Sequence, residues 1–286
     1  MTLLLQESLD VGEMIFHHTA DTCTIDFYPL GAWQIPGCHL TYPMAATLSP
    51  TKHVVFLLLA AVLVFVSMMV TARGLTRQRA GENAPRGFAG AMEGLVLFVR
   101  NDIAIASIGH DGAKFAPLII TLFFLILYSN LLGLMPWGAS PTGNLAVTAA
   151  LAILVFLTIE VSGMLKLGAK GYLGTIFPKI PGLSGPGAIA MSIFMAPIEL
   201  VGKLVKPFAL SVRLFGNMTA GHFVILSLFG IVFLFGHLGA VSWGIGILTA
   251  LLVVGVMLLE LIVAILQAYV FALLSAVFIG LLQHEH

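Results

Sequence analysis

Charged residues are scarce in this chain of 286 residues. They make up 9% of it, whereas a soluble globular domain carries about 25%. Hydrophobic residues make up 59%, and the mean hydropathy is +1.05. This balance excludes a soluble globular domain and predicts a protein that crosses a membrane several times. Basic and acidic residues number 13 each, so the net charge indicates nothing about partners.

The chain also lacks the motifs of nucleotide binding and covalent catalysis. It has no phosphate-binding loop, no Ser/His/Asp arrangement and no paired-cysteine motif. Three histidines near the N-terminus, His17, His18 and His39, show no fixed metal-ligand spacing. We therefore expect a chain that is not an enzyme by itself, holds no metal, needs no cofactor and binds no nucleic acid.

Long uncharged apolar stretches predict membrane-spanning helices, each of which needs about 20 residues. Only Glu260 interrupts the last apolar stretch, so we expect one very long helix there, which must tilt or curve. The predicted fold is all-α, with about five membrane helices in a domain over residues 51–286. Its parts are a first span at 53–72, an amphipathic surface helix at 88–105, a helical hairpin at 115–165, and long tilted helices at 188–236 and 238–283.

Basic residues set the orientation, because cytoplasmic loops carry an excess of Lys and Arg. Lys52 is the one Lys or Arg in residues 1–52, and the turns at 137–142 and 237–240 contain no Lys or Arg. Both basic loops should therefore be cytoplasmic, with the N-terminus outside and the C-terminus inside. The basic residues of these loops are Arg73, Arg77, Arg79, Arg86, Arg100 and Lys114, and then Lys166, Lys170, Lys179, Lys203 and Lys206.

The first 50 residues lack the basic and apolar regions of a signal peptide, so we expect a mature segment outside the membrane. It holds the two cysteines of the chain, Cys23 and Cys38, which flank the stretch "TIDFYPLGAWQIPG". An outside location permits a disulfide between them. One pair in one sequence is equally compatible with two free thiols, and both alternatives stay open.

Ionisable residues within the apolar helices are the most informative feature, because each costs several kcal/mol in the membrane unless it is paired or hydrated. They are Glu160, Glu199, Arg213, His222 and Glu260. For Glu160 and Glu199, near the cytoplasmic ends of their helices, the alternative is a side chain that extends to the membrane surface. The alternative role for Arg213 is a structural ion pair with Glu260. The alternative role for His222 is that of a hydrogen-bonded core residue.

Helical spacing groups these residues by face. Glu199, Lys206 and Arg213 are seven residues apart, within about 40° of one another, and Asn217 lies one turn beyond the arginine. Lys206 precedes a proline, and a simple interfacial marker is its alternative role. On the last helix, Glu260 and Gln267 share a face in the same way.

His222 falls on the opposite face from Arg213, about nine residues further along the helix. An imidazole and the Glu260 carboxylate on neighbouring helices suggest a proton relay. Arg213 keeps its charge even when desolvated, so it can act as a fixed positive barrier to protons. Its own helix face presents no free carboxylate beside it in the membrane, which points to a partner carboxylate on another chain.

Several stretches resemble subunit a of F-type ATP synthases. Two of them resemble its signature helices, "PIELVGKLVKPFALSVRLFGNMTAGH" at 197–222 and "ELIVAILQAYVFALLSAVFIGL" at 260–281. The stretches "LFFLILYSNLLGLMP" at 122–136 and "MEGLVLFVRNDIA" at 92–104 resemble other parts of the family. The resemblance covers residues 50–284. It implies a stator subunit in a bacterial inner membrane, with the c-ring oligomer, the b subunits of the peripheral stalk and the rest of the F1Fo complex as partners.

The resemblance also implies roles for single residues. Arg213 matches the essential arginine, and Lys206 matches a basic position. The residues that match polar positions along the proton path are Asn217, Gln267 and Glu199. These residues would serve two offset half-channels, one to each side of the membrane.

One pair departs from the pattern of many bacterial members. They carry an acid where this chain has His222 and a histidine where it has Glu260, so the pair is exchanged as in mitochondrial-type members. The exchange keeps one acid and one imidazole between the same helices. The coupling ion is open between H⁺ and Na⁺, and we expect H⁺. The alternative functions are a secondary transporter with a mid-membrane ionisable site, and a purely structural membrane subunit.

Overall fold

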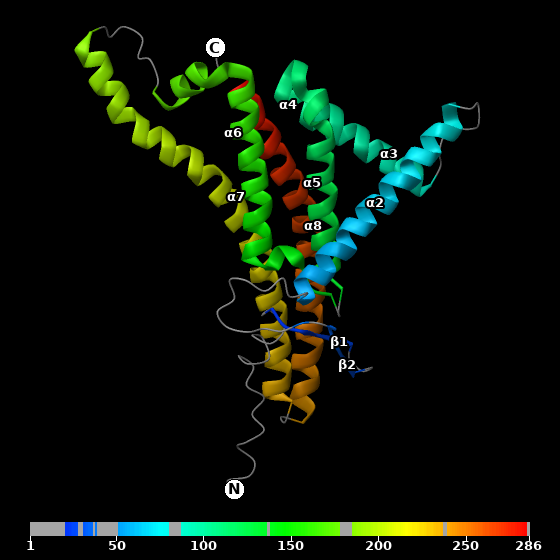
Figure 1. Cartoon of the computed structure of the whole chain (residues 1–286). Coiled ribbons are helices and arrows are strands. Elements are labelled where there is room, and N and C mark those ends of the chain that lie inside the picture. Colours follow the sequence, from blue (N-terminus) through cyan, green and yellow to red (C-terminus); the bar gives the residue numbers. More distant parts are fainter. Residues whose placement is uncertain are drawn as a thin grey trace. The chain divides into compact units, whose positions relative to one another are not determined.

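The structure is a computed structural model that describes residues 21–27, 31–36, 38, 51–79, 87–135, 138–177, 185–236 and 239–284. The three histidines near the N-terminus that were considered as metal ligands lie outside these residues. They are His17, His18 and His39. Helices dominate the described part (Figure 1). They are α2 (Lys52–Arg79), α3 (Phe88–Phe98), α4 (Ala106–Ile108), α5 (Gly112–Gly133), α6 (Leu145–Ile176), α7 (Pro186–Phe235) and α8 (Ala240–His284).

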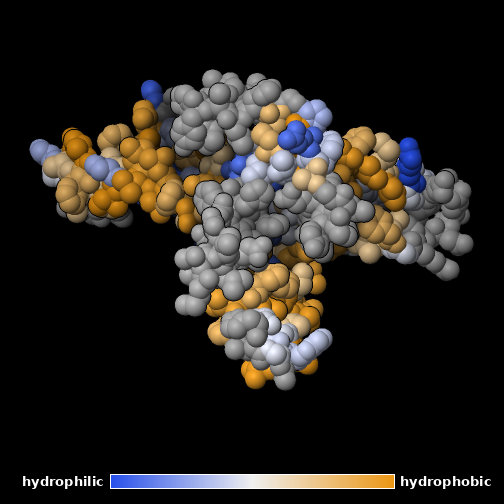
Figure 2. All heavy atoms as spheres, turned by 90° about the horizontal axis from the view of Figure 1, so that it is seen from below, coloured by the Kyte–Doolittle hydropathy of each residue, from blue (hydrophilic) through white to orange (hydrophobic). Residues whose placement is uncertain are grey.

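Five helical stretches of the described chain are long and apolar enough to cross a membrane. In four of them the apolar side chains are largely exposed, whereas more than half of the most apolar part of Phe88–Gly133 is buried. Figure 2 shows hydrophobic residues over much of the described surface in that view. Such a surface suits contact with lipid or with other membrane helices. The predicted class, an all-α polytopic membrane protein, is confirmed. The stretches are Lys52–Gly74, Phe88–Gly133, Leu145–Gly168, Ile189–Phe235 and Val241–Gln283.

The chain divides into two compact units, and each is described by itself. The first unit comprises Met1–Leu63, Ile126–Asn144 and Leu214–Gln267. The second unit comprises Val64–Leu125, Leu145–Arg213 and Ala268–His286. Four of the five boundaries fall inside α2, α5, α7 and α8, so each of these helices contributes residues to both units, and the fifth boundary directly precedes α6.

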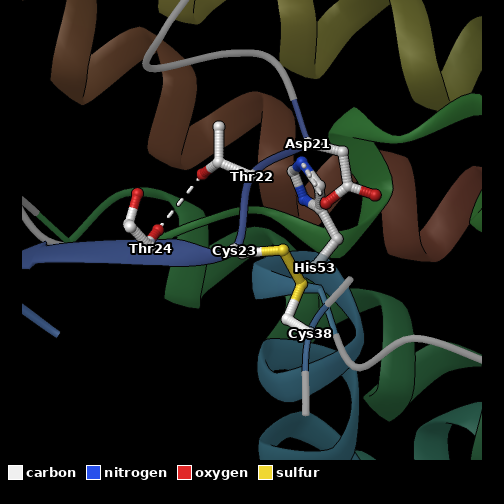
Figure 3. The surroundings of a disulfide bond; sticks show 6 residues. All are labelled: Asp21, Thr22, Cys23, Thr24, Cys38 and His53. Atoms are coloured by element: carbon white, nitrogen blue, oxygen red, sulfur yellow. Dashed lines mark hydrogen bonds and ion pairs between the residues drawn. A yellow bond between two sulfur atoms is a disulfide. The ribbon is translucent and has the colours of Figure 1, made fainter. Parts of the chain in front are cut away.

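The first unit contains a small antiparallel sheet that the sequence reasoning did not predict. Strands β1 (Thr24–Phe27) and β2 (Gly31–Gln34) pair in register, with Ile25 opposite Trp33. Beside the sheet, Cys23 and Cys38 form a disulfide with their Cα atoms 5.6 Å apart (Figure 3). The backbone N–H of Lys52 donates to the carbonyl of Thr22 at 3.1 Å. The strand segment is thereby tied to the first residue of α2.

In the second unit, α6 is interrupted at Gly168. This residue has φ 68° and ψ 168°, which lies outside the helical region and in a range that favours glycine. The chain then continues in helical form through Tyr172 and Thr175 to Ile176. Tyr172 and Thr175 thereby reach back to the polar residues of α6 and α7 that are described below.

The segment between α3 and α5 includes a turn of π-helix, η1 (Val99–Ile105), and two short elements, α4 and the 3₁₀ turn η2 (Gly109–Asp111). In η1, Val99 and Ile103 are buried, whereas Arg100 and Asp102 are exposed. The segment thus has one apolar and one polar side. That its polar side lies on the cytoplasmic membrane surface stays a prediction.

Candidate functional site

In the first unit, Glu260 lies on the buried face of α8 against α7. Its side chain is buried, with 5% exposed. Gly221 of α7 faces it so closely that a Cβ atom at this glycine would lie 2.1 Å from Glu260 Oε1. Close approach of the two helices therefore depends on a residue without a side chain at 221. The other buried residues on this face of α8 include Thr249, Val253, Ala264 and Gln267.

Asn217 and Gln267 join the same two helices by a hydrogen bond. The Asn217 amide donates from Nδ2 to Gln267 Oε1 at 3.0 Å. Asn217 and Glu260 also line one pocket, whose volume is about 290 Å³. Within the described part of the chain, no group forms a hydrogen bond with Glu260 Oε1 or with Gln267 Nε2. A buried carboxylate of this kind beside a pocket can exchange a proton with whatever enters the pocket.

His222 lines a different pocket of the first unit. This pocket has a volume of about 30 Å³ and is also lined by His53, Ser140 and Thr219. Gly221 and His222 are consecutive on α7, so their directions differ by about 100°. This offset explains why Gly221 faces Glu260 while His222 lines the other pocket. A close approach of His222 to Glu260 itself stays a prediction.

Arg213 is the last residue of α7 that belongs to the second unit. Its side chain is exposed, and it makes no hydrogen bond or ion pair with any residue that the structure describes. The opposite side of this turn is packed, because Ser211 is buried and its Oγ donates to Thr148 Oγ1 of α6 at 3.2 Å. Arg213 is thus on the side of α7 away from this contact.

Exposed residues continue along α7 on the arginine side. Ala209, Arg213, Asn217 and Ala220 are all exposed and are spaced by three or four residues, which places them on one helix face. Three of these four side chains are short. This face, with its single arginine, is referred to below as the arginine face.

The second unit gathers the remaining predicted residues around one pocket. Glu160, Glu199 and Lys206 line it, and its volume is about 150 Å³. Glu199 is half-buried, whereas Lys206 is exposed, with its Nζ atom 5.4 Å from the centre of the Phe278 ring. The sequence grouped Glu199 and Lys206 by helical spacing, and the structure adds Glu160 of α6 to the same pocket.

Lys203 is a residue of this pocket that the sequence reasoning treated only as a marker of a cytoplasmic loop. It is buried, with 9% exposed, and lies 3.8 Å from Glu160 Oε2. Its ammonium donates to Thr175 Oγ1 at 2.8 Å and lies 4.5 Å from the centre of the Tyr172 ring. The Tyr172 hydroxyl donates to Glu160. One feature of the sequence could have identified Lys203 as part of this site. Lys203 comes four residues after Glu199, one helical turn further along the polar side of α7.

Uncharged polar residues of the first unit form a second feature that the sequence did not indicate. Asn130 of α5 donates from Nδ2 to the carbonyl of Ala264 at 3.2 Å. Its Oδ1 atom accepts from Thr142 Oγ1 at 2.6 Å, and the Thr142 hydroxyl lies 2.7 Å from that of Ser140. Asn130 and Thr142 are almost completely buried. Ala264 is one turn beyond Glu260, so this network reaches the helix that carries the carboxylate.

Across the described ranges, no group of three or more His, Cys, Asp or Glu side chains is arranged to hold a metal ion. The chemistry of the described site is therefore that of ionisable and amide side chains inside apolar helices. This combination defines a class of membrane protein that moves ions or protons, because buried ionisable groups in apolar helices mark such paths.

Comparison with known proteins agrees with this class. Residues 54–280 match the family described as ATP synthase A chain. The chain is 44% identical over 271 residues to ATP synthase subunit a 2 of Chlorobaculum tepidum, covering 94% of this chain and 72% of the relative. It is 40% identical over 270 residues to subunit a of Chloroherpeton thalassium, covering 94% and 76%. With subunit a of Myxococcus xanthus the identity is 44% over 246 residues, covering 84% and 75%.

The chain belongs to the ATP synthase subunit a family. It is accordingly a membrane subunit of the proton-translocating Fo sector and part of an F1Fo complex.

Proposed function

We propose that this chain is the non-catalytic stator subunit that presents two offset half-channels to a rotating ring of c subunits. The observation that carries the proposal is Arg213. It is an exposed cation on an apolar helix, without a hydrogen bond or ion pair among the described residues. A permanent charge of this kind in a membrane requires a partner, and the short side chains of the arginine face leave room for another helix.

The mechanism follows from the charge states of a carboxylate on the ring. In lipid such a carboxylate stays protonated, because burial disfavours its charged form. Beside Arg213 the ionised form is favoured, so the proton leaves through a cytoplasmic half-channel near Glu199. The ionised site then passes the arginine and takes a new proton from an outer half-channel lined by Glu260, His222, Asn217 and Gln267. A membrane potential supplies about 2.3 kcal/mol per charge per 100 mV to this cycle.

Two arrangements within the units support this division of roles. Glu199 and Lys206 line one pocket of the second unit, and Asn217 and Glu260 line one pocket of the first. In the sequence of α7, Arg213 comes after Lys206 and before Asn217. In the proposed cycle its fixed positive charge stops protons from passing directly from one half-channel to the other.

We further propose a bacterial inner membrane as the location, with the N-terminus outside and the C-terminus cytoplasmic. The distribution of Lys and Arg between the predicted loops supports this orientation. Besides the c-ring, the proposed partners are the b subunits of the peripheral stalk.

The test is Arg213→Ala in the complete complex, reconstituted into vesicles. We expect potential-driven ATP synthesis and ATP-driven proton pumping to be lost, with normal complex content, because nothing then separates the half-channels. Arg213→Lys should fail as well, since a desolvated ammonium can release its proton and lacks the planar guanidinium. Near wild-type coupled synthesis by Arg213→Ala would show that the arginine is structural.

A further inference from the structure

A buried histidine lies at the start of α2, next to the disulfide-bonded segment. His53 is 5% exposed, and its Nδ1 atom lies 3.0 Å from the carbonyl oxygen of Ser140. Its Nε2 atom lies 4.0 Å from Asp21 Oδ1. Figure 3 shows the Asp21 carboxylate and the His53 imidazole side by side, close to the bond between Cys23 and Cys38. The family resemblance assigned no role to His53 or to Asp21.

The hydrogen bond with Ser140 determines which nitrogen of His53 can take up a proton. A carbonyl oxygen only accepts, so Nδ1 must carry the hydrogen and donate it. In the neutral imidazole, Nε2 is then the basic atom. A proton that binds to Nε2 places a positive charge next to the Asp21 carboxylate.

Asp21 is arranged to receive this charge. Its Oδ2 atom accepts a hydrogen bond from Asn144 Nδ2 at 3.2 Å. Its Oδ1 atom is buried and accepts no hydrogen bond from any residue within the described ranges. Oδ1 is the oxygen that lies nearest to His53 Nε2. A proton on His53 Nε2 would place a positive charge 4.0 Å from this oxygen, a distance within ion-pair range but longer than a direct hydrogen bond.

His53 also connects to the predicted proton path. It lines the same pocket as His222 and Thr219 of α7, and the pocket volume of about 30 Å³ is enough for a water molecule. His222 follows Gly221, the residue that faces Glu260. His53 and His222 thus line one small pocket, and His222 adjoins the glycine that faces the carboxylate.

Two sets of contacts hold the components of this cluster in place. Ser140 belongs to the buried network with Thr142 and Asn130, which ends on the carbonyl of Ala264. On the other side, the segment of Asp21 is held by the Cys23–Cys38 disulfide and by the bond from the Lys52 backbone to Thr22. The titratable and charged groups near His53 include Asp21, His222 of the same pocket and Lys52, the buried residue that precedes His53.

We propose that His53 is the proton-loading residue of the outer half-channel, with Asp21 as its positioning residue and the Cys23–Cys38 disulfide as the tether that holds Asp21 beside it. Nε2 takes a proton from the outer water, and the imidazolium is stabilised by Asp21. The same proton then leaves through pocket water towards His222, which restores the neutral ring with its hydrogen on Nδ1. The inference rests on the proposed function, because it adds an entry step to the outer half-channel.

The test measures potential-driven ATP synthesis in vesicles that contain the complete complex, with the pH on the outer side varied from about 5 to 8, the range in which histidine titrates. The variants are His53→Gln and Asp21→Asn, and His110→Gln is the control, because His110 is an exposed histidine of the second unit. Glutamine can still donate to Ser140 but cannot carry a proton. The complex content of every preparation is measured.

For His53→Gln we expect a fivefold to tenfold lower rate and a flatter dependence on outer pH. For Asp21→Asn we expect a smaller loss and a changed dependence on outer pH, because the amide removes the negative charge beside the ring. Opening the disulfide by the double change Cys23→Ser and Cys38→Ser should resemble Asp21→Asn. His110→Gln should keep the wild-type rate and profile.

Two outcomes overturn the inference. One is a wild-type rate and profile in both His53→Gln and Asp21→Asn. The other is a lower rate in either variant with an unchanged pH profile, which a merely structural contribution would produce. Arg213→Ala in the same preparations separates this failure from failure of the proposed function. If Arg213→Ala abolishes coupling while His53→Gln keeps the wild-type dependence of ATP synthesis on outer pH, the proposed function stands and only the proton-entry step is wrong.

Discussion

Glu160 and Glu260 are both carboxylates inside apolar helices, but their surroundings differ. Glu160, in the second unit, accepts a hydrogen bond from Tyr172 and lies 3.8 Å from the ammonium of Lys203. Glu260, in the first unit, is more deeply buried, yet its Oε1 atom has no hydrogen-bond partner within the described residues. The first carboxylate has a countercharge beside it, and the second lies against a glycine and a pocket.

The difference teaches how to separate a structural carboxylate from one that transfers protons. Removing one partner of a buried ion pair is costly, so the pair of Glu160 and Lys203 contributes to stability only while both residues are present. A carboxylate without a countercharge can be neutral or charged, according to what approaches it. We therefore interpret Glu160 as a residue that fixes α6 against α7, and Glu260 as a residue of the proton path.

Among substitutions next to Glu260, we expect Gly221→Val to lower the rate of coupled ATP synthesis the most. A Cβ atom at this position would lie 2.1 Å from Glu260 Oε1 and 3.0 Å from its Cγ atom, so the carboxylate must move. Since a displacement of about 1 Å can cost on the order of 100-fold in rate, we expect coupled ATP synthesis to fall at least tenfold. The measurement is potential-driven synthesis in reconstituted vesicles, normalised to complex content.

The matched control is Gly244→Val on α8, because a Cβ atom at Gly244 meets nothing within 4 Å. Both substitutions place the same β-branched residue in a helix, so they share the intrinsic effect on helix stability. Equal rates in the two variants would contradict the close approach of Gly221 to Glu260.

Compared with Gly221→Val, we expect Lys203→Met to lower the rate of coupled ATP synthesis less and the stability of the subunit more. It leaves Glu160 without its cation, which should destabilise the subunit by about 3 kcal/mol. The double change Lys203→Met and Glu160→Gln should recover most of this loss, because no buried charge then remains unpaired. Thermal unfolding of the purified complex, followed for this subunit, measures both values.

Coupling in the Lys203→Met complexes that do assemble should stay above half of the wild-type rate. Complete loss of coupling in fully assembled complexes would instead place Lys203 on the proton path.

Much of the fold was predictable from the sequence, because long apolar stretches have few alternatives in a membrane. The long helix predicted at 238–283 corresponds to α8 (Ala240–His284), and Glu260 and Gln267 are both on its buried side, as helical spacing indicated. The small sheet of β1 and β2 was not predicted. Its strands are four residues each, too short for a clear alternating pattern.

The polar contacts of the site were less predictable. Asn130 and Thr142 carry no charge, so nothing in their positions distinguished them from other residues of an apolar helix or turn. Lys203 was counted with the basic residues that set the orientation, and its partners Tyr172 and Thr175 come close only because α6 is interrupted at Gly168. Arg213, in contrast, was identified from the sequence and is exposed in the structure, and a partner for it on another chain stays a prediction.

The most direct test of the contrast between the two carboxylates is a side-by-side measurement of Glu260→Gln and Glu160→Gln. Both substitutions remove one negative charge and keep the shape of the side chain. Potential-driven ATP synthesis is measured in vesicles with equal amounts of assembled complex. We predict at least a tenfold loss of rate for Glu260→Gln, and more than half of the wild-type rate for Glu160→Gln with a lower unfolding temperature. Equal rates in the two variants, or a greater loss for Glu160→Gln, would contradict the account.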